Sequence, residues 1–100
     1  MDIIKTMDSG IVTLTLSGRL DTLTSGELAK ELDELFADNV PNIVFNFEQL
    51  DYVSSAGLRV LLSAQKKVSS AGATMKITGA NDNIKEIFEI TGFSSFMTIE

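Results

Sequence analysis

The sequence predicts an α/β fold in which a mixed, mostly parallel sheet of four to five strands packs against three or more helices. Two kinds of segment alternate along the chain. In the strand-like segments apolar residues alternate or are continuous, and in the helix-like segments they recur at helical spacing. No proline-, glycine- or serine-rich tract interrupts this alternation. The chain has 100 residues, 44% of them hydrophobic, so we expect one domain over residues 1–100 that folds without metal or disulfides.

A hairpin is expected at the N-terminus. Residues 3–7 and 11–16 have the composition of strands, and residues 8–10 between them form the turn. Val12, Leu14 and Leu16 share one face of the second strand at a period of two, with threonines opposite.

The first helix is expected from about residue 24 to residue 37. Thr24 and Glu27 have capping-box spacing, although Asp21 or Thr22 is an alternative cap. The inward stripe of this helix falls at i, i+4, i+7 and i+8, at Leu28, Leu32, Leu35 and Phe36.

The middle of the chain predicts a central strand followed by a second helix. Residues 43–47 form a near-continuous apolar run, which suits a parallel strand covered on both faces. A short loop is expected next, ending in two serines, and then a helix over residues 55–70 that Gly72 stops.

The last third repeats this pattern. Residues 74–78 predict a strand, and residues 82–90 predict a helix capped by Asn81 and stopped by Gly92. The apolar tail over residues 93–99 is expected as a short strand or a loop packed on the sheet. Right-handed β-α-β crossovers would join these elements.

Ser54 and Ser55 stand where a strand passes into a helix N-terminus, a place that suits an anion. On spacing alone a plain N-cap is the favoured interpretation. A phosphorylated Ser55 would lie one turn from Arg59, which is otherwise an ordinary exposed residue. Ala56 and Gly57 keep the first turn free of bulk, so that another protein could approach the backbone.

A second polar segment, Gly18 to Asp21, ends a strand and precedes the first helix. Its simplest interpretation is a turn with an acid at the helix start. Alternatively, Asp21, Thr22 and Thr24 form a polar lip beside the two serines, because both segments follow strands at one sheet edge. For Leu23 and the aromatic residues of the tail, core packing is favoured over a role as interface anchors.

Composition excludes several functions. The net charge is −6 and the eight basic residues are scattered, so nucleic-acid or anionic-membrane binding is not expected. Cysteine and histidine are absent, which removes thiolate chemistry and the usual general base. Glu27 and Glu31 make a poor metal site. We therefore expect no enzyme and no cofactor, and a cytoplasmic protein, since no signal peptide or membrane span is recognised.

Three segments carry a resemblance to the STAS domain family, and more closely to its stand-alone bacterial anti-sigma factor antagonists. Gly18-Arg19-Leu20-Asp21 is similar to a G-x-L-D element of that family. Residues 57–62, which follow the two serines, resemble the start of its second helix, and residues 87–93 resemble its third helix and stop.

The resemblance implies a phosphorylation switch. The unphosphorylated protein would bind an anti-sigma factor that is also a serine kinase and free a sigma factor. Phosphorylation would end the complex, and a metal-dependent serine phosphatase would reset it. The implied acceptor is Ser55, with Ser54 as the alternative, because Ser54 stands where well-known members have an aspartate. A STAS subunit of a transport or other signalling complex, working without phosphorylation, is the alternative function. The implied partner-binding residues are Asp21, Thr22, Ser54, Ala56, Gly57 and Arg59.

Overall fold

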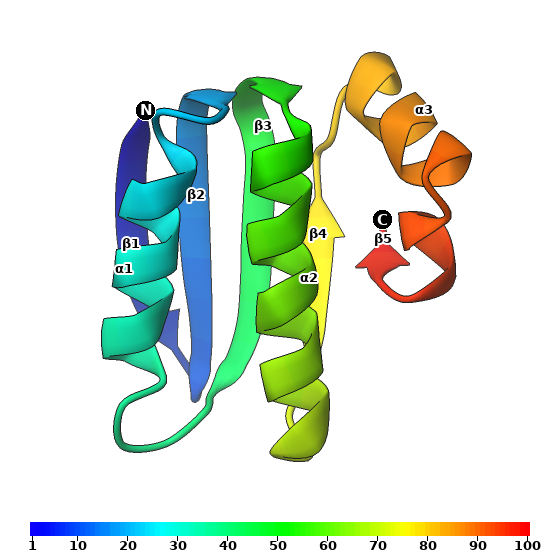
Figure 1. Cartoon of the computed structure of the whole chain (residues 1–100). Helices are drawn as coiled ribbons and strands as arrows, with labels where there is room; N and C mark the ends of the chain where they lie inside the picture. The colour runs from blue at the N-terminus through cyan, green and yellow to red at the C-terminus, as the bar shows by residue number, and fades with distance from the viewer.

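The computed structural model describes residues 1–100 and confirms the α/β class. Five strands form one sheet in the order β1-β2-β3-β4-β5; β1 pairs antiparallel with β2, and every other pair is parallel (Figure 1). The elements are β1 (Asp2–Asp8), β2 (Ile11–Leu20), α1 (Ser25–Leu35), β3 (Asn42–Val53), α2 (Ser55–Ser70), β4 (Met75–Thr78), α3 (Asp82–Ile90), a 3₁₀ turn η1 (Phe93–Ser95) and β5 (Thr98–Ile99).

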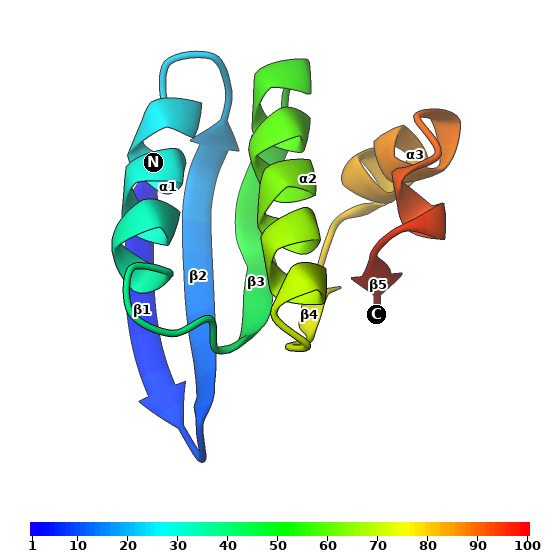
Figure 2. The same cartoon turned by 60° about the horizontal axis from the view of Figure 1, so that its bottom comes forward.

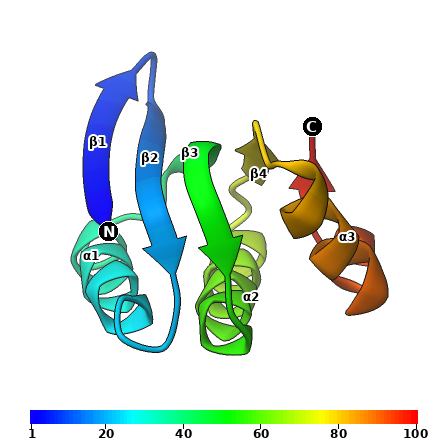
Figure 3. The same ribbon diagram turned by 90° about the horizontal axis from the view of Figure 1, so that it is seen from above.

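The helices lie on one face of the sheet. From β2 to β5 each crossover moves one strand in the same direction, and right-handed crossovers of that kind place their helices on the same side. Figure 3 shows α1 and α2 along one face only. The expectation that residues 43–47 are covered on both faces is therefore wrong: Phe45 is fully buried, whereas Val44 and Asn46 on the opposite face are partly exposed.

The predicted N-terminal hairpin is confirmed. Asp8 pairs with Ile11 across a two-residue loop. Ser9 and Gly10 in that loop have φ of 53° and 79°, the positive angles that a tight hairpin turn needs to match the strand twist. Figure 2 shows this turn projecting beyond the end of α1.

A single core of 22 buried residues joins the sheet to all three helices. Phe47 is at its centre, with ring centroids 6.1 Å from Phe45 on the same strand and 6.5 Å from Phe88 of α3. In the tail, Met97 is buried and Phe96 is 61% exposed, so only part of this apolar segment packs as expected.

The end signals of α2 and α3 produce the predicted bounds. The Asn81 side chain accepts a hydrogen bond from the Ile84 N–H and caps α3, and Gly92 follows its C-cap with φ of 79°. α1 is shorter than expected and has no side-chain cap from Thr24, so the predicted capping box does not form. No helix combines the length and the apolar character needed to span a membrane.

Candidate functional site

The candidate site lies where β2 and β3 end beside the start of α2. β3 continues to Val53 and passes directly into α2, so the loop expected before the serines is strand. Its pairing with β2 is irregular, with register shifts between Thr15 and Ser17 and between Gly18 and Arg19. These irregularities bring Arg19 opposite Tyr52.

The two serines have different surroundings. Ser54 is the N-cap of α2: its hydroxyl accepts a hydrogen bond from the Gly57 N–H at 3.3 Å, and its own N–H donates to the Leu20 carbonyl at 2.8 Å. Ser55 is the first helical residue, is exposed, and makes no side-chain hydrogen bond within the chain. The N-cap interpretation thus applies to Ser54, and the Ser55 hydroxyl is free to meet another molecule.

The helix start is electropositive at this point. The first turn of α2 contains no acidic residue, so nothing in that turn neutralises the positive end of the helix dipole. Ser55 stands in the turn whose backbone N–H groups lack helical acceptors.

Gly57 corrects an inference from the sequence. It is buried, and a Cβ built on it would lie 2.7 Å from Leu20 Cγ and 2.9 Å from the Leu20 carbonyl oxygen. The glycine therefore lets the start of α2 approach the end of β2 inside the chain. The sequence predicted that Gly57 leaves space for a partner protein. The structure shows instead that Leu20 of the same chain fills this space.

The loop from Asp21 to Thr24 is ordered by its own side chains. Asp21 Oδ1 accepts hydrogen bonds from the N–H groups of Leu23 at 3.0 Å and Thr24 at 3.1 Å. Thr24 Oγ1 accepts from the Asp21 N–H at 2.9 Å and donates to the Arg19 carbonyl at 2.7 Å. The hydrogen bond from the Thr24 backbone is the main cause that lowers the pKa of Asp21 below its ordinary value.

This ordered loop presents Leu23 to solvent. Leu23 is 88% exposed, so the expectation that it packs in the core is wrong. Thr22 is also exposed, and Asp21 is partly covered. Because the Leu20 carbonyl is bonded to Ser54, the loop and the two serines share one edge of the molecule.

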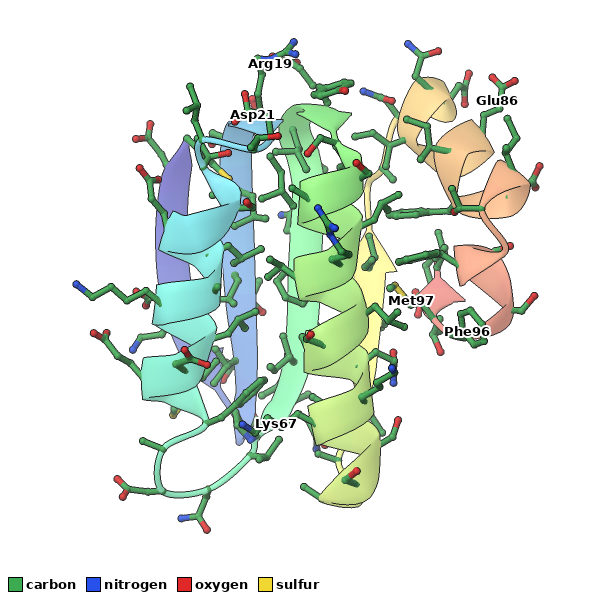
Figure 4. The ribbon with its side chains drawn as sticks, viewed as in Figure 1. Arg19, Asp21, Lys67, Glu86, Phe96 and Met97 are labelled. Carbon is green, nitrogen blue, oxygen red and sulfur yellow. The ribbon has the colours of Figure 1, made fainter.

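Two further residues of this edge are Arg19 and Tyr52, to which the sequence assigned no role of their own. The Arg19 guanidinium stands over the Tyr52 ring, 4.3 Å from its centroid, and Arg19 Nε is 3.7 Å from Asp21 Oδ2. Figure 4 shows Arg19 and Asp21 together at this end of the sheet. The pairing of β2 with β3 is the signal that could have indicated this contact. The register shifts between the two strands prevent the sequence from showing that Arg19 lies opposite Tyr52.

Arg59 is exposed on α2, one turn after Ser55, and makes no ion pair within the chain. Ala56 beside the serines is partly exposed. The arrangement thus gathers a free hydroxyl, a helix N-terminus, a cation within reach and an ordered loop. No group of three histidine, cysteine, aspartate or glutamate side chains comes together to hold a metal ion.

A comparison with known families assigns the chain to one of them. The STAS domain family matches residues 2–100. The chain belongs to the STAS domain family. Its sheet of five strands with three helices is the fold of that family.

Relatives of this STAS domain are named as regulators. The anti-sigma-B factor antagonist of Staphylococcus aureus is 31% identical over 84 residues, which cover 84% of this chain and 78% of the relative. An anti-sigma factor antagonist from Mycobacterium paratuberculosis has a TM-score of 0.87 at 17% identity, covering 98% of this chain and 83% of that one.

A third similar protein has been solved in two states. The unphosphorylated form of the anti-sigma factor antagonist SpoIIAA has a TM-score of 0.79 at 15% identity, covering 99% of this STAS domain and 87% of that chain. The phosphorylated form, from Bacillus, has a TM-score of 0.78 at 19% identity, covering 99% and 91%. At these identities the likeness is one of fold.

Proposed function

We propose that this STAS domain is an anti-sigma factor antagonist controlled by phosphorylation of Ser55. Unphosphorylated, it binds an anti-sigma factor that is also a serine kinase, and this releases a sigma factor. The kinase then phosphorylates Ser55 and the complex dissociates. A metal-dependent serine phosphatase restores the binding form.

The difference between the two serines carries this proposal. The Ser54 hydroxyl is engaged in capping α2, whereas Ser55 is exposed and has no internal hydrogen bond. A kinase can therefore reach the Ser55 oxygen without breaking the helix cap. The names of the relatives supply the class of partner, and the phosphorylated form of SpoIIAA supplies a precedent for the modification.

The covalent steps are a simple exchange of bonds. The Ser55 oxygen forms a bond to the γ-phosphorus of ATP, the bond from that phosphorus to the ADP oxygen breaks, and a base of the kinase takes the hydroxyl proton. In the reset, water attacks the phosphoserine, giving back the hydroxyl and inorganic phosphate.

A phosphate at Ser55 favours release of the partner and leaves the fold intact. It adds a charge of about −1.5 to −2 in the middle of a contact surface, where a closely packed partner would have to desolvate it. Within the chain, by contrast, it meets the uncompensated N-terminus of α2 and can reach Arg59.

The proposed partner surface extends over the edge formed by the β2–α1 loop and the start of α2. Asp21 and Thr22 contribute from the loop, with exposed Leu23 as an apolar anchor beside them. Gly57 acts from beneath by bringing α2 close to β2. The residues assigned to direct contact are Asp21, Thr22, Leu23, Ser54, Ser55, Ala56 and Arg59.

The partners of this protein are thus other proteins. A net charge of −6 disfavours direct contact with nucleic acid or an anionic membrane. We place the protein in the cytoplasm, because the switch needs ATP and a sigma factor in the same compartment.

The decisive experiment uses each anti-sigma factor kinase of the source organism, purified individually. The domain is incubated with kinase and ATP, the phosphate is located by mass spectrometry, and kinase capture is measured before and after. We expect one phosphate in the wild type and in Ser54→Ala, and none in Ser55→Ala, which stays bound. Ser54→Ala should also lower the free energy of unfolding by about 1 kcal/mol, because the cap is lost.

Two results would count against the proposal. A phosphate that persists in Ser55→Ala and disappears in Ser54→Ala would assign the switch to the capping serine. Failure of the wild type to bind or accept phosphate from any of the kinases would remove this STAS domain from sigma-factor control.

A further inference from the structure

Arg59 belongs to two features of the surface at once. It follows Ser55 by one turn of α2, where Cβ atoms are about 5–6 Å apart. It also lines a groove of about 390 Å³ between α1 and α2. The groove begins near the switch and runs along the helix pair.

The groove has an apolar floor and a charged rim. Most of the floor is formed by Leu32 of α1, Phe36 directly after α1, and Val60 and Ala64 of α2. Figure 4 shows Lys67 between α1 and α2, at the opposite end of the helix pair from Arg19 and Asp21. The complete lining is Ala29, Leu32, Asp33, Phe36, Arg59, Val60, Ser63, Ala64 and Lys67.

The two cations on the α2 rim have no ionic partner in the chain. The ion pairs of the structure join Arg19 to Asp21 and Lys76 to Glu100. Arg59 and Lys67 are both exposed and unpaired, although the chain has a net charge of −6. They are eight residues apart, which is about 12 Å along a helix. Asp33 is the acidic residue of the groove and lies on the α1 side. Unpaired cations on the α2 side of an apolar floor therefore fit a segment that is apolar and turns its acidic residues toward α2.

We propose that this groove receives an acidic, amphipathic helix of the anti-sigma factor, and that Arg59 couples the groove to the switch. In the unphosphorylated protein Arg59 pairs with a carboxylate of that helix. After phosphorylation Arg59 turns to the phosphate on Ser55, and the helix loses one of its two ionic contacts. This inference rests on the proposed function and explains how the modification acts beyond the modified residue.

The anti-sigma factor is the fitting occupant because the groove is continuous with the proposed contact surface. A protein docked over Ser55 already lies at one end of the groove. A length of about 12 Å corresponds to about two turns of a docked helix, so carboxylates about two turns apart would meet Arg59 and Lys67.

Charge decides between the two partners of Arg59. The phosphate carries about −1.5 to −2, compared with −1 for a carboxylate, and it offers three acceptor oxygens to the guanidinium. It is also attached to the same helix, so no second molecule has to be held in place. Arg59 therefore prefers the phosphate once it is present.

The test compares Arg59→Gln with Lys67→Gln, the matched change at the other end of the rim. Dissociation constants are measured for the anti-sigma factor kinase with ADP bound, so that no phosphoryl group is transferred. Each variant is prepared unphosphorylated and with phosphoserine incorporated at position 55. Circular dichroism checks that every variant is folded.

Both variants should bind the kinase about tenfold more weakly than the wild type when unphosphorylated, the size expected for one charge-assisted contact. They should differ in their response to phosphate. In Lys67→Gln the ratio of the two dissociation constants stays as in the wild type, whereas in Arg59→Gln it shrinks by about tenfold, because this contact is already lost. Lys85→Gln on α3 serves as a distant control and should change neither constant.

A second measurement needs no partner. In ³¹P NMR titrations of the phosphorylated domain, the second pKa of the phosphate should be lower in the wild type and in Lys67→Gln than in Arg59→Gln. Equal values in all three would overturn the pairing of Arg59 with the phosphate.

Other outcomes are equally informative. Unchanged affinities of the unphosphorylated variants would overturn the docking site while leaving the proposed function in place. An unchanged ratio in Arg59→Gln would overturn the coupling alone. A wild type that binds none of the kinases would overturn both this inference and the proposed function.

Discussion

Ser54 and Ser55 have the same side chain but different backbone conformations. Ser54 is extended, with φ of −90° and ψ of 173°, and this geometry aims its side chain at the Gly57 N–H. Ser55 has entered the helix, so its hydroxyl faces outward. The sequence located the pair but could not show which hydroxyl bonds to a backbone N–H, because serine is a good cap and both residues stand at the helix start.

Asp21 is the residue whose protonation should disturb the loop beside the two serines. The pKa of Asp21 is lowered in the folded state, so its ionised carboxylate stabilises the fold. This stabilisation is complete at a pH above 3.8, the ordinary pKa, and is lost as the pH falls through the lower pKa of the folded state. We expect carbon NMR to give a midpoint for this carboxyl below 3.8, with the amide signals of Leu23 and Thr24 shifting at the same pH.

Asp21→Asn provides the comparison for that titration. The amide oxygen still accepts hydrogen bonds but carries no charge, so the variant should be less stable than the wild type at neutral pH. The difference should vanish at a pH below the midpoint of the wild type. A difference that is independent of pH would show that the charge of Asp21 contributes nothing.

At the scale of elements, the bounds of helices and strands were predicted correctly where residues at their ends mark a start or a stop. α2 and α3 were predicted with the bounds that the structure has, because serine, asparagine and glycine mark their ends. β3 was predicted too short, since Glu48 and Gln49 break the alternation of buried residues where the strand is irregular. The contact between Arg19 and Tyr52 depends on that irregular register, and no pattern within either segment reveals it.

Gly57 sets the distance between α2 and β2. In Gly57→Ala the new Cβ would overlap Leu20, including its carbonyl oxygen, so backbone must shift. We expect the free energy of unfolding to fall by about 1–3 kcal/mol, as in overpacked sites. Denaturant titration would measure this loss.

Gly26→Ala is the matched control for that change. Gly26 is also in a helix, and a Cβ there would have no neighbour within 4 Å. This variant should be neutral or up to about 1 kcal/mol more stable, because alanine favours the helix. If both variants behaved alike, the close approach of α2 to Leu20 would not be the reason for a glycine at position 57.

For the whole molecule, the one-sided arrangement separates the core from the proposed phosphorylation site. Core residues fill the layer between the sheet and the helices, whereas Ser55 lies at the edge where β2 and β3 end. The other face of the sheet has no helix over it. The sequence predicted the class of fold but not this asymmetry, since continuous apolar runs look alike whether one face or two are covered.

Because of this separation, phosphorylation should leave the fold unchanged. The phosphate would add favourable charge at the N-terminus of α2, on a residue that is exposed. We expect the phosphorylated domain to equal the unphosphorylated one in free energy of unfolding, or to exceed it by up to about 1 kcal/mol. Thermal melts of both forms would check this, and a clear loss of stability would mean that release works through unfolding.

Tyr52 gives the molecule a built-in optical reporter. The chain contains one tyrosine and no tryptophan, so its tyrosine fluorescence, excited at wavelengths that phenylalanine does not absorb, comes from one ring. That ring lies under the Arg19 guanidinium near the end of β3, two residues before Ser54. Emission from the unlabelled protein therefore describes this edge alone. With a partner that lacks tryptophan, docking and phosphoryl transfer could be followed in real time without attaching a dye.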